Sequence, residues 1–366
     1  MLLALAAGTL SWRRYARLPL LPPALDGAAR DDVWPSVSII VPARDEARRI
    51  GPLLASLNAL DYPAKEIIVV DDNSTDGVGD VARTYDVHVL AAAPLTTGWT
   101  GKAAACALGA DTATGEWLLF TDADTIHSAP SLRAAMREVH ARRLDALSLM
   151  TGQVCAGRAQ RLLLPLAYAV LFGGAATEAS GFKSVAPLAN GQYILCRAAA
   201  YHAAGGHAHR DVRGSVIDDV ALARVLVAHG LVYRLYRAES LVAVAMYDDL
   251  KGVWTGFRKN AARYVLDDPR RLPGAALTTT AFSATTVRLA RAVVRRDLDA
   301  VALLGIVLGY AAACGAVVPW CRRCGVHAGY ALLHPLGALV VAAITADSTW
   351  RVLFRRGARW KGRRYR

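Results

Sequence analysis

The strongest constraint on the fold is an alternation that begins at Ser36, in which short apolar, β-prone runs are separated by stretches with apolar residues at helical spacing. The runs predicted to be strands are Val37–Ala43, 66–72, 87–90, the run that starts at Trp117, and 145–149, and a helix is predicted over 46–60. Such alternation predicts an α/β fold with a mostly parallel sheet and helices on both faces.

Two pairs of carboxylates follow strands of this predicted sheet. Asp71 and Asp72 end the second strand, and Asp122 and Asp124 follow the strand that starts at Trp117. Ligands of open α/β sheets bind outside the carboxyl ends of the strands, so both pairs lie at the expected binding edge. Asp122 and Asp124 would point the same way in an extended chain and could share one cation, whereas a single D-x-D is also common in a plain turn. The two pairs together predict a ligand site.

The familiar phosphate-binding motifs do not occur in the sequence. No G-x-G-x-x-G follows the first strand and there is no G-x-x-x-x-G-K-[ST], which argues against a dinucleotide or P-loop site. The run GWTGK at 98–102 has the wrong spacing for a phosphate loop. Lys102 is therefore expected to be solvated, unless the ligand carries a diphosphate.

Two stretches near the C-terminus, 300–320 and 326–344, contain no charged residue, and the first begins directly after Asp299. Each has about 20 residues, the length that spans a ~30 Å hydrocarbon core, so 299–347 is predicted to be a transmembrane helical hairpin. The apolar N-terminus is short for a span and has no basic region ahead of it. We interpret it as a partial anchor rather than a secretory signal.

The net charge of +13 is concentrated at the C-terminus, where 351–366 holds eight Lys or Arg and no acid. The rest of the chain is only mildly basic, so nucleic acid is not an expected partner. A basic flank after an apolar helix marks the cytoplasmic face, which predicts a cell (inner) membrane protein whose main domain is cytoplasmic. Residues 272–287 are interpreted as interfacial, because a third span would export most of these charges.

The predicted organisation is an anchor and linker (1–35), the α/β domain (36–270), an interfacial segment (271–298), the hairpin (299–347) and a basic cytoplasmic tail (348–366). Residues 161–176 are apolar but broken by Pro165 and are interpreted as an interfacial helix or an acceptor-lining segment, with a buried core helix as the alternative. Cys321 and Cys324 form a C-x-x-C with no second pair or His cluster, so a zinc site is not expected there. The six cysteines of a cytosolic chain do not indicate a disulfide framework.

Four blocks, VSIIVPARDEARRIGPLLASL, EIIVVDDNSTD, LLFTDAD and VIDDVALA, occur in this order between residue 37 and about residue 226. In sequence and order they resemble family 2 of the glycosyltransferases, which have the GT-A fold. The resemblance implies a nucleotide-sugar donor, a UDP-hexose above all, and a divalent cation, Mg²⁺ or Mn²⁺, that neutralises the departing diphosphate.

The same resemblance assigns roles to individual residues. It implies that Asp124 is the metal ligand, that Asp122 contacts the ribose or the metal shell, and that Asp219 is the general base of an inverting single displacement. The nucleotide site would further include Pro42, Glu46, Asp72 and Lys102, with Asp72 on the base and Lys102 on the diphosphate. Asp71 is expected to form a turn, and Asp218 could serve as a helix N-cap.

Shorter motifs, among them GWTGKAAACALGA, GQYILCRAAAYHAAGGH and the closing RWKGRRY, are similar to membrane glycosyltransferases of the carotenoid-acid (4,4'-diaponeurosporenoate) type and their hopanoid-associated relatives. This likeness implies a membrane-soluble carotenoid or other terpenoid acceptor. Residues 258–264 read RKNAARY where processive members carry Q-x-x-R-W, which favours transfer of a single sugar. The alternatives are a polyprenyl-phosphate or glycerolipid glycosyltransferase, a sugar nucleotidyltransferase, and a non-catalytic membrane scaffold.

Overall fold

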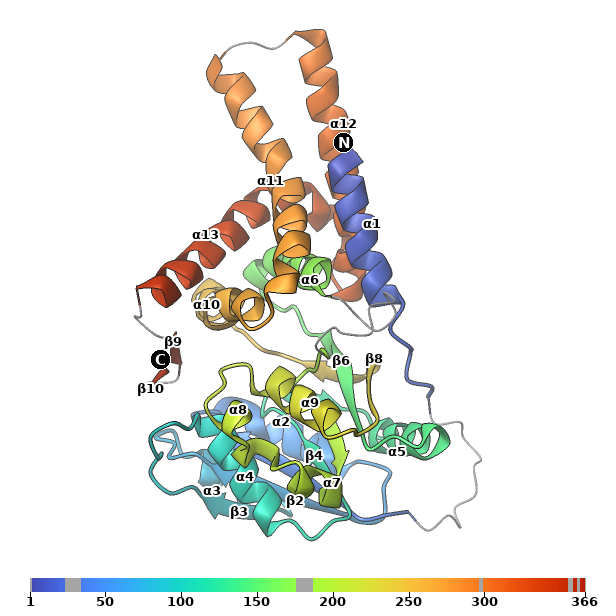
Figure 1. The fold of residues 1–366 in the computed structure, drawn as a ribbon, viewed down its shortest axis with the longest axis vertical. Helices are drawn as coiled ribbons and strands as arrows, with labels where there is room; N and C mark the ends of the chain where they lie inside the picture. Colours follow the sequence, from blue (N-terminus) through green and yellow to red (C-terminus); the bar gives the residue numbers. More distant parts are fainter. Residues whose placement is uncertain are drawn as a thin grey trace. The chain divides into compact units, whose positions relative to one another are not determined.

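The computed structural model describes residues 2–23, 34–175, 187–295, 299–354, 358–360 and 363–365. It divides into two compact units (Figure 1). The α/β unit comprises Pro19–Gly152 and Ala186–Val244. The helical unit comprises Met1–Leu18, Gln153–Val185 and Ala245–Arg366.

The α/β unit is built on an eight-stranded sheet with the strand order β3-β2-β1-β4-β7-β6-β8-β5. Strands β3, β2, β1 and β4 are mutually parallel, whereas β7 pairs antiparallel with both β4 and β6, and β5 pairs antiparallel with β8. The strands are β1 (Val37–Ala43), β2 (Lys65–Asp71), β3 (His88–Ala91), β4 (Trp117–Phe120), β5 (Thr125–His127), β6 (Ala146–Gln153), β7 (Ile194–Arg197) and β8 (Tyr233–Val244).

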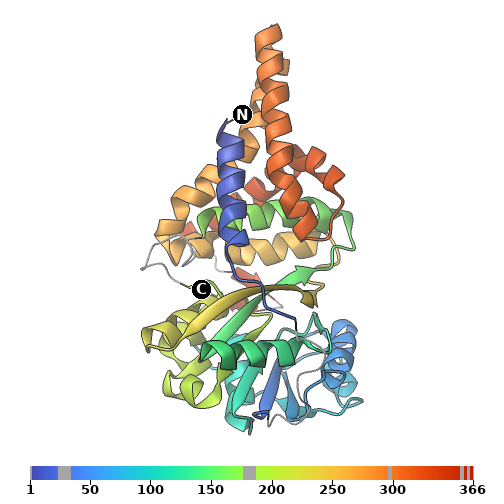
Figure 2. The ribbon, with the colours of Figure 1, turned by 90° about the vertical axis from the view of Figure 1, so that its right-hand side faces the viewer.

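Helices cover both faces of this sheet (Figure 2). Alternate residues of β1 divide between two cores, because successive side chains of a strand point to opposite faces. Ile39 packs in the core that contains α2 and α5, whereas Ile40 packs with Cys106 of α4 and Leu222 of α9. The helices are α2 (Ala47–Asn58), α3 (Val78–Ala82), α4 (Gly101–Thr112), α5 (Ser131–Arg142), α7 (Ala198–Ala203), α8 (Arg210–Arg213) and α9 (Asp218–Ala228), with a 3-10 turn at Gly206–Ala208.

The helical unit packs its helices around α6. Glycines allow the close crossing of α6 and α11, since a Cβ on Gly173 would collide with Thr278 and a Cβ on Gly274 with the carbonyl of Gly173. The helices are α1 (Leu2–Ala16), α6 (Arg158–Gly174), α10 (Leu250–Leu266), α11 (Leu272–Arg295), α12 (Ala300–Arg323) and α13 (His334–Leu353), with 3-10 turns at Pro269–Arg271 and Ala328–Leu333 and a strand pair, β9 (Ala358–Trp360) and β10 (Arg363–Tyr365).

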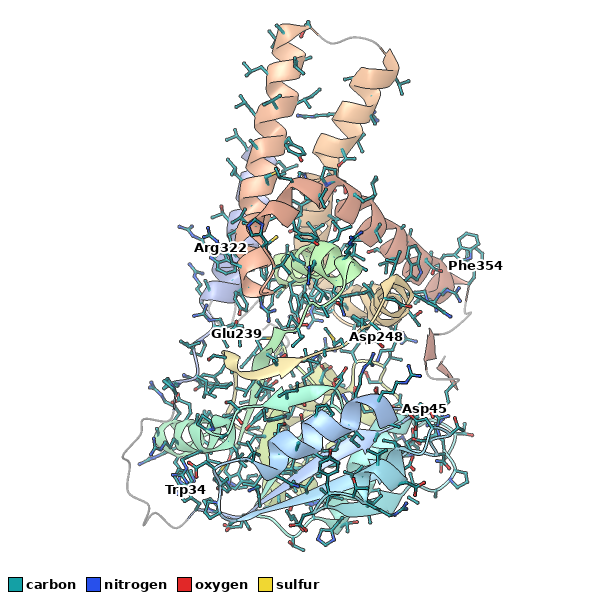
Figure 3. The ribbon with its side chains drawn as sticks, turned by 180° about the vertical axis from the view of Figure 1, so that it is seen from behind. Trp34, Asp45, Glu239, Asp248, Arg322 and Phe354 are labelled. Carbon is teal, nitrogen blue, oxygen red and sulfur yellow. The ribbon has the colours of Figure 1, made fainter. Side chains whose placement is uncertain are left out.

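Within the described residues, two helical stretches are long and apolar enough to cross a membrane, Ala300–Arg323 and Ala328–Leu353. Side chains of α12 stand out from the helix (Figure 3). Val301, Leu304 and Val307 of this helix are 80%, 58% and 53% exposed. In Figure 1, α13 runs obliquely to α12.

The α/β class of the domain is confirmed, but the sheet is mixed rather than mostly parallel. Residues 161–176 were expected to form an interfacial helix, to line an acceptor site or to form a core helix; residues 161–174 lie in α6, a helix of the helical unit. Residues 245–270 belong to the helical unit. The predicted division of the chain, with an α/β domain over 36–270, stays a prediction. The segment 272–287, interpreted as interfacial, lies within α11.

Candidate active site

The acidic pair after β4 lies in a turn. The strand ends at Phe120, and the backbone N–H of Thr125 donates to the carbonyl of Asp122 at 3.3 Å, which closes a turn around Asp124. The extended geometry in which Asp122 and Asp124 would point the same way is therefore wrong, because the strand stops before the first of them. Thr121 fixes this turn through its Oγ1, which lies 2.8 Å from Thr125 Oγ1 and donates to the Gln192 carbonyl at 2.9 Å.

The second acidic pair follows β2. Asp72 is 4% exposed, and its backbone N–H donates at 2.8 Å to the carbonyl of Ala43, the last residue of β1. Arg44 Nη1 donates to the Asp72 carbonyl at 2.5 Å and lies 4.0 Å from the Asp72 carboxylate. The Asp71 carboxylate accepts the N–H of Ser74 at 2.9 Å, which matches the turn-forming role expected for it.

The loop between β1 and α2 shares this edge of the sheet. Asp45 lies beside the start of α2 (Figure 3) and accepts the N–H of Thr75 at 2.8 Å, which links the two strand ends. Pro42 is the half-buried penultimate residue of β1, and Glu46 lies 3.5 Å from Arg49 just before α2 begins. Pro42 and Glu46, both predicted for the nucleotide site, thus lie on either side of the carboxyl end of β1.

Lys102 lies in the first turn of α4, whose N-cap is Thr100. Its Nζ is 2.6 Å from Asp122 Oδ1 and 4.0 Å from Asp218 Oδ2. Burial lowers the pKa of Lys102, but the carboxylates of Asp122 and Asp218 more than offset this and hold the pKa well above its ordinary value. Lys102 is therefore ionised and joins the acidic block after β4 to the one at α9.

The third acidic block opens α9. Asp218 is the first residue of this helix and Ile217 is the N-cap, so an N-cap role for Asp218 is wrong. Asp219 Oδ2 accepts the N–H of Gly191 at 2.9 Å and Oδ1 accepts the N–H of Val220 at 2.8 Å. Burial, followed by the neighbouring Asp218 carboxylate, raises the pKa of Asp219, although Lys102 and the two N–H donors oppose the shift.

Sequence reasoning missed Gly191, which presents its N–H to Asp219. The loop that contains Gly191 is hydrogen-bonded to β6. The backbone N–H of Asn190 donates to Ser148 Oγ at 2.9 Å, and the Asn190 side-chain amide donates to the Leu149 carbonyl at 2.9 Å. A Cβ on Gly191 would lie 2.8 Å from Lys102 Nζ and 3.4 Å from Asp219 Cβ, so only glycine leaves room for the lysine in this position. The contact is made by a backbone atom and has no sequence signature.

His207 was also missed, although it ends the run GQYILCRAAAYHAAGGH. It is 2% exposed, its Nδ1 is 2.9 Å from the Tyr201 hydroxyl, and its Nε2 is 3.9 Å from Asp218 Oδ2. Burial lowers the pKa of His207 to about 4, with Asp218 opposing the shift. A neutral imidazole therefore lies beside Asp218 Oδ2 at neutral pH.

The carboxylates after β4 fit a hard divalent cation. Among the described residues, no three or more His, Cys, Asp or Glu side chains are grouped to hold a metal ion. Mg²⁺ is commonly bound by one or two carboxylates together with substrate phosphates, and Asp122 and Asp124 can supply such oxygens. The expected metal site would thus be completed by the substrate rather than by a cage of protein ligands.

Residues 38–161 match the model of glycosyl transferase family 2. The chain is 26% identical over 357 residues to the 4,4'-diaponeurosporenoate glycosyltransferase of Staphylococcus aureus (strain bovine RF122 / ET3-1), an alignment that covers 90% of this chain and 88% of the relative. The same protein from strain USA300 matches with the same identity and coverage.

Among solved structures, a mannosyltransferase from Pyrobaculum calidifontis in complex with GDP-Man and Mn²⁺ superposes with a TM-score of 0.55 at 20% identity, covering 96% of both chains. At this identity the likeness shows the fold, which is GT-A. The predicted fold is therefore confirmed. Together with the curated relatives, these matches identify the chain as a glycosyltransferase of the GT-A fold in which residues 38–161 match the family 2 model.

Proposed function

We propose that the chain is a membrane-attached, inverting, metal-dependent glycosyltransferase that moves one sugar from a nucleotide sugar to a lipid-soluble acceptor. The observation that carries this proposal is the cluster of Lys102, Asp122, Asp218 and Asp219, which gathers two separate acidic blocks around one lysine. A non-catalytic scaffold would have no need of this arrangement.

Asp219 is the proposed general base. Its two oxygens are oriented by the N–H groups of Gly191 and Val220, and its raised pKa makes it a stronger proton acceptor than an ordinary carboxylate. With a hydroxyl acceptor, Asp219 removes the hydroxyl proton while the acceptor oxygen attacks the anomeric carbon; a carboxylate acceptor attacks with its proton already lost. The bond from that carbon to the nucleoside diphosphate breaks on the opposite face, and the sugar inverts.

The donor is proposed to lie along the carboxyl ends of β1, β2 and β4. Asp124, with Asp122 in the ribose or metal shell, would hold Mg²⁺ or Mn²⁺, which supplies Lewis-acid neutralisation of the departing diphosphate. Asp72 would accept from the nucleobase, with Pro42 and Glu46 lining the same site.

UDP is the proposed nucleotide of the donor. The neighbour with the GT-A fold was solved with GDP-Man, which makes GDP the alternative. Competition of UDP and GDP against the same donor distinguishes the two, since the correct nucleoside diphosphate inhibits at the lower concentration.

The proposed acceptor is a carotenoid acid or another terpenoid. It is supported by the curated relatives, which are named for diaponeurosporenoate, and by two helices long and apolar enough to reach a bilayer. We propose that these helices hold the protein in the cell membrane with the α/β unit on the cytoplasmic side. A polyprenyl-phosphate or glycerolipid acceptor is the alternative.

An in vitro transfer assay tests the proposal. Detergent-solubilised protein is incubated with Mn²⁺, a UDP-hexose and a carotenoid acid, and both the released nucleotide and the lipid product are measured. UDP and a hexosylated acceptor are expected in equal amounts. In a parallel reaction that supplies UTP and a hexose 1-phosphate instead, release of pyrophosphate would indicate a nucleotidyltransferase. In a third reaction that offers a polyprenyl phosphate beside the carotenoid acid, transfer only to the polyprenyl phosphate would establish the alternative acceptor.

A further inference from the structure

The ion pair between Lys102 and Asp122 occupies a carboxylate that the donor's cation would also approach. Lys102 Nζ is 2.6 Å from Asp122 Oδ1, a short charge-assisted contact, and both side chains are about one-third exposed. A Cβ on Gly191 would lie 2.8 Å from Lys102 Nζ and 3.5 Å from an Asp219 oxygen, so the ammonium and that carboxylate face the same glycine. The ammonium thus lies among three carboxylates.

The charges around Lys102 do not balance. Asp122, Asp218 and Asp219 all act on its ammonium group, which carries a single positive charge. The surplus is negative, so the cluster attracts further positive charge. A divalent cation beside Asp122 would satisfy that surplus, but it would also repel the ammonium at short range.

The Lys102 side chain can move away from Asp122. Its stem is a flexible four-carbon chain, and its side chain is 32% exposed rather than locked in the core. The nucleoside diphosphate that accompanies the cation presents phosphate oxygens, which accept from an ammonium as a carboxylate does. The Lys102 ammonium can therefore exchange the Asp122 carboxylate for a phosphate oxygen and remain paired with a negative charge.

We infer that Lys102 is a built-in counter-ion which competes with the divalent cation for Asp122 and passes to the donor diphosphate when the cation binds. This inference rests on the proposed function, because it requires a donor that carries both a diphosphate and a metal ion. Lys102 then makes binding of the metal and of the nucleotide mutually dependent. The metal alone must displace the lysine from its 2.6 Å contact with Asp122 and leaves it only the more distant carboxylates of Asp218 and Asp219. A nucleotide that binds with the metal offers the displaced ammonium phosphate oxygens instead.

Mutual dependence of this kind is a coupling free energy, and it is reciprocal. If the nucleotide tightens Mn²⁺ binding by some factor, Mn²⁺ tightens nucleotide binding by the same factor. Direct contact between the metal and the phosphates gives part of that factor in any such site. The inference concerns the additional part, which should disappear when the charge of Lys102 is removed.

The test is Mn²⁺ binding to the full-length, detergent-solubilised protein, measured by electron paramagnetic resonance of free Mn²⁺ with and without UDP and with and without GDP. Lys102→Met removes the charge, Lys102→Gln removes it but keeps a polar group for Asp122, and Lys102→Arg retains it. Lys251→Met removes one charge from an exposed lysine of the helical unit and serves as the matched control. Thermal unfolding of each variant verifies that it is folded.

For Lys102→Met and Lys102→Gln, Mn²⁺ alone is expected to bind about 5-fold or more tightly than to the wild type, and the effect of the nucleotide on Mn²⁺ affinity is expected to fall by about 10-fold. Lys102→Arg and Lys251→Met should resemble the wild type. The inference is overturned if folded neutral variants bind Mn²⁺ alone no more tightly than the wild type. If no protein binds Mn²⁺ even with a nucleotide present, the metal dependence in the proposed function fails as well.

Discussion

Replacement of Asp219 by Asn is expected to have an effect that depends on the acceptor. A hydroxyl acceptor must lose its proton during attack, whereas a carboxylic acid is already ionised near neutral pH. Loss of a general base typically costs 10²- to 10⁴-fold in rate, about 3 to 5 kcal/mol of transition-state stabilisation. We therefore expect a loss of that size with a long-chain alcohol and a loss below about 10-fold with a carotenoid or fatty acid.

The structure also sets the cost of this substitution to the fold. Asp219 accepts two backbone N–H groups, one on each oxygen, from Gly191 and Val220. Asn offers one carbonyl oxygen and one NH₂ group, so one of these donors loses its acceptor, at a cost of about 1 kcal/mol. Relief of the repulsion from Asp218 opposes this cost. The variant should remain folded and should retain binding of nucleotide and metal.

The assay compares kcat/KM of wild type and Asp219→Asn with one alcohol and one carboxylic acid of equal chain length. With the alcohol, wild-type kcat/KM should rise with pH as Asp219 loses its proton, above the ordinary value of 3.8, because burial raises its pKa. Activity is lost as the pH falls through that raised pKa, and the Asn variant should lack the rise. Equal losses with both acceptors would refute the assignment. If Asp219→Asn instead abolishes nucleotide binding while Asp218→Asn abolishes transfer, the two roles are reversed.

Three further predictions concern the metal, the glycine and a buried histidine. Asp124→Ala should make UDP affinity insensitive to Mn²⁺ in a binding assay, and full metal dependence in this variant would contradict its assignment as ligand. Gly191→Ala should raise the donor KM several-fold, because the added Cβ would displace the Lys102 ammonium. The free energy of unfolding should change by less than about 1 kcal/mol. An unchanged KM would show that the close approach of Gly191 and Lys102 is unimportant. Burial lowers the pKa of His127 to about 3. As the pH falls, the unfolded state therefore takes up the His127 proton at a higher pH than the folded state does. The free energy of unfolding should decrease by up to about 1.4 kcal/mol per pH unit below pH ~6.5. Thermal unfolding of wild type and His127→Gln at pH 5 and 7 measures this, and equal pH sensitivity of the two proteins would contradict it.

The parallel half of the sheet could be predicted from the sequence because β1, β2 and β4 are largely buried and read as continuous apolar runs, whereas the edge strand β3 is half-exposed. The prediction for β1, Val37–Ala43, agrees with the structure at both ends. In the antiparallel half, β6 was predicted as 145–149, whereas β5, β7 and β8 were missed for physical reasons. β5 and β7 have only three and four residues, and β8 carries exposed charged residues such as Arg234, so none shows the pattern of a buried strand.

The acidic residues of the site could be identified from their positions after strands, but their geometry could not. The turn at Asp122 is set by Thr121 and Thr125, whose hydroxyl contacts form only once β4 and β5 are in place. The Lys102 contact joins segments that are far apart in the chain, and the Gly191 contact is made by a backbone amide. Neither leaves a periodic or compositional trace.

The central claim is the transfer of one sugar to a membrane-soluble acceptor, and lipid analysis of cells tests it most directly. Lipid extracts from cells that express the wild-type protein, the Asp124→Ala variant or no protein are compared by mass spectrometry, with the carotenoid pathway present in all three. The account predicts a pigment or lipid heavier by one hexose in the wild-type extract alone. Identical lipid profiles in all three extracts, with the proteins expressed and the pigment detected, would contradict it.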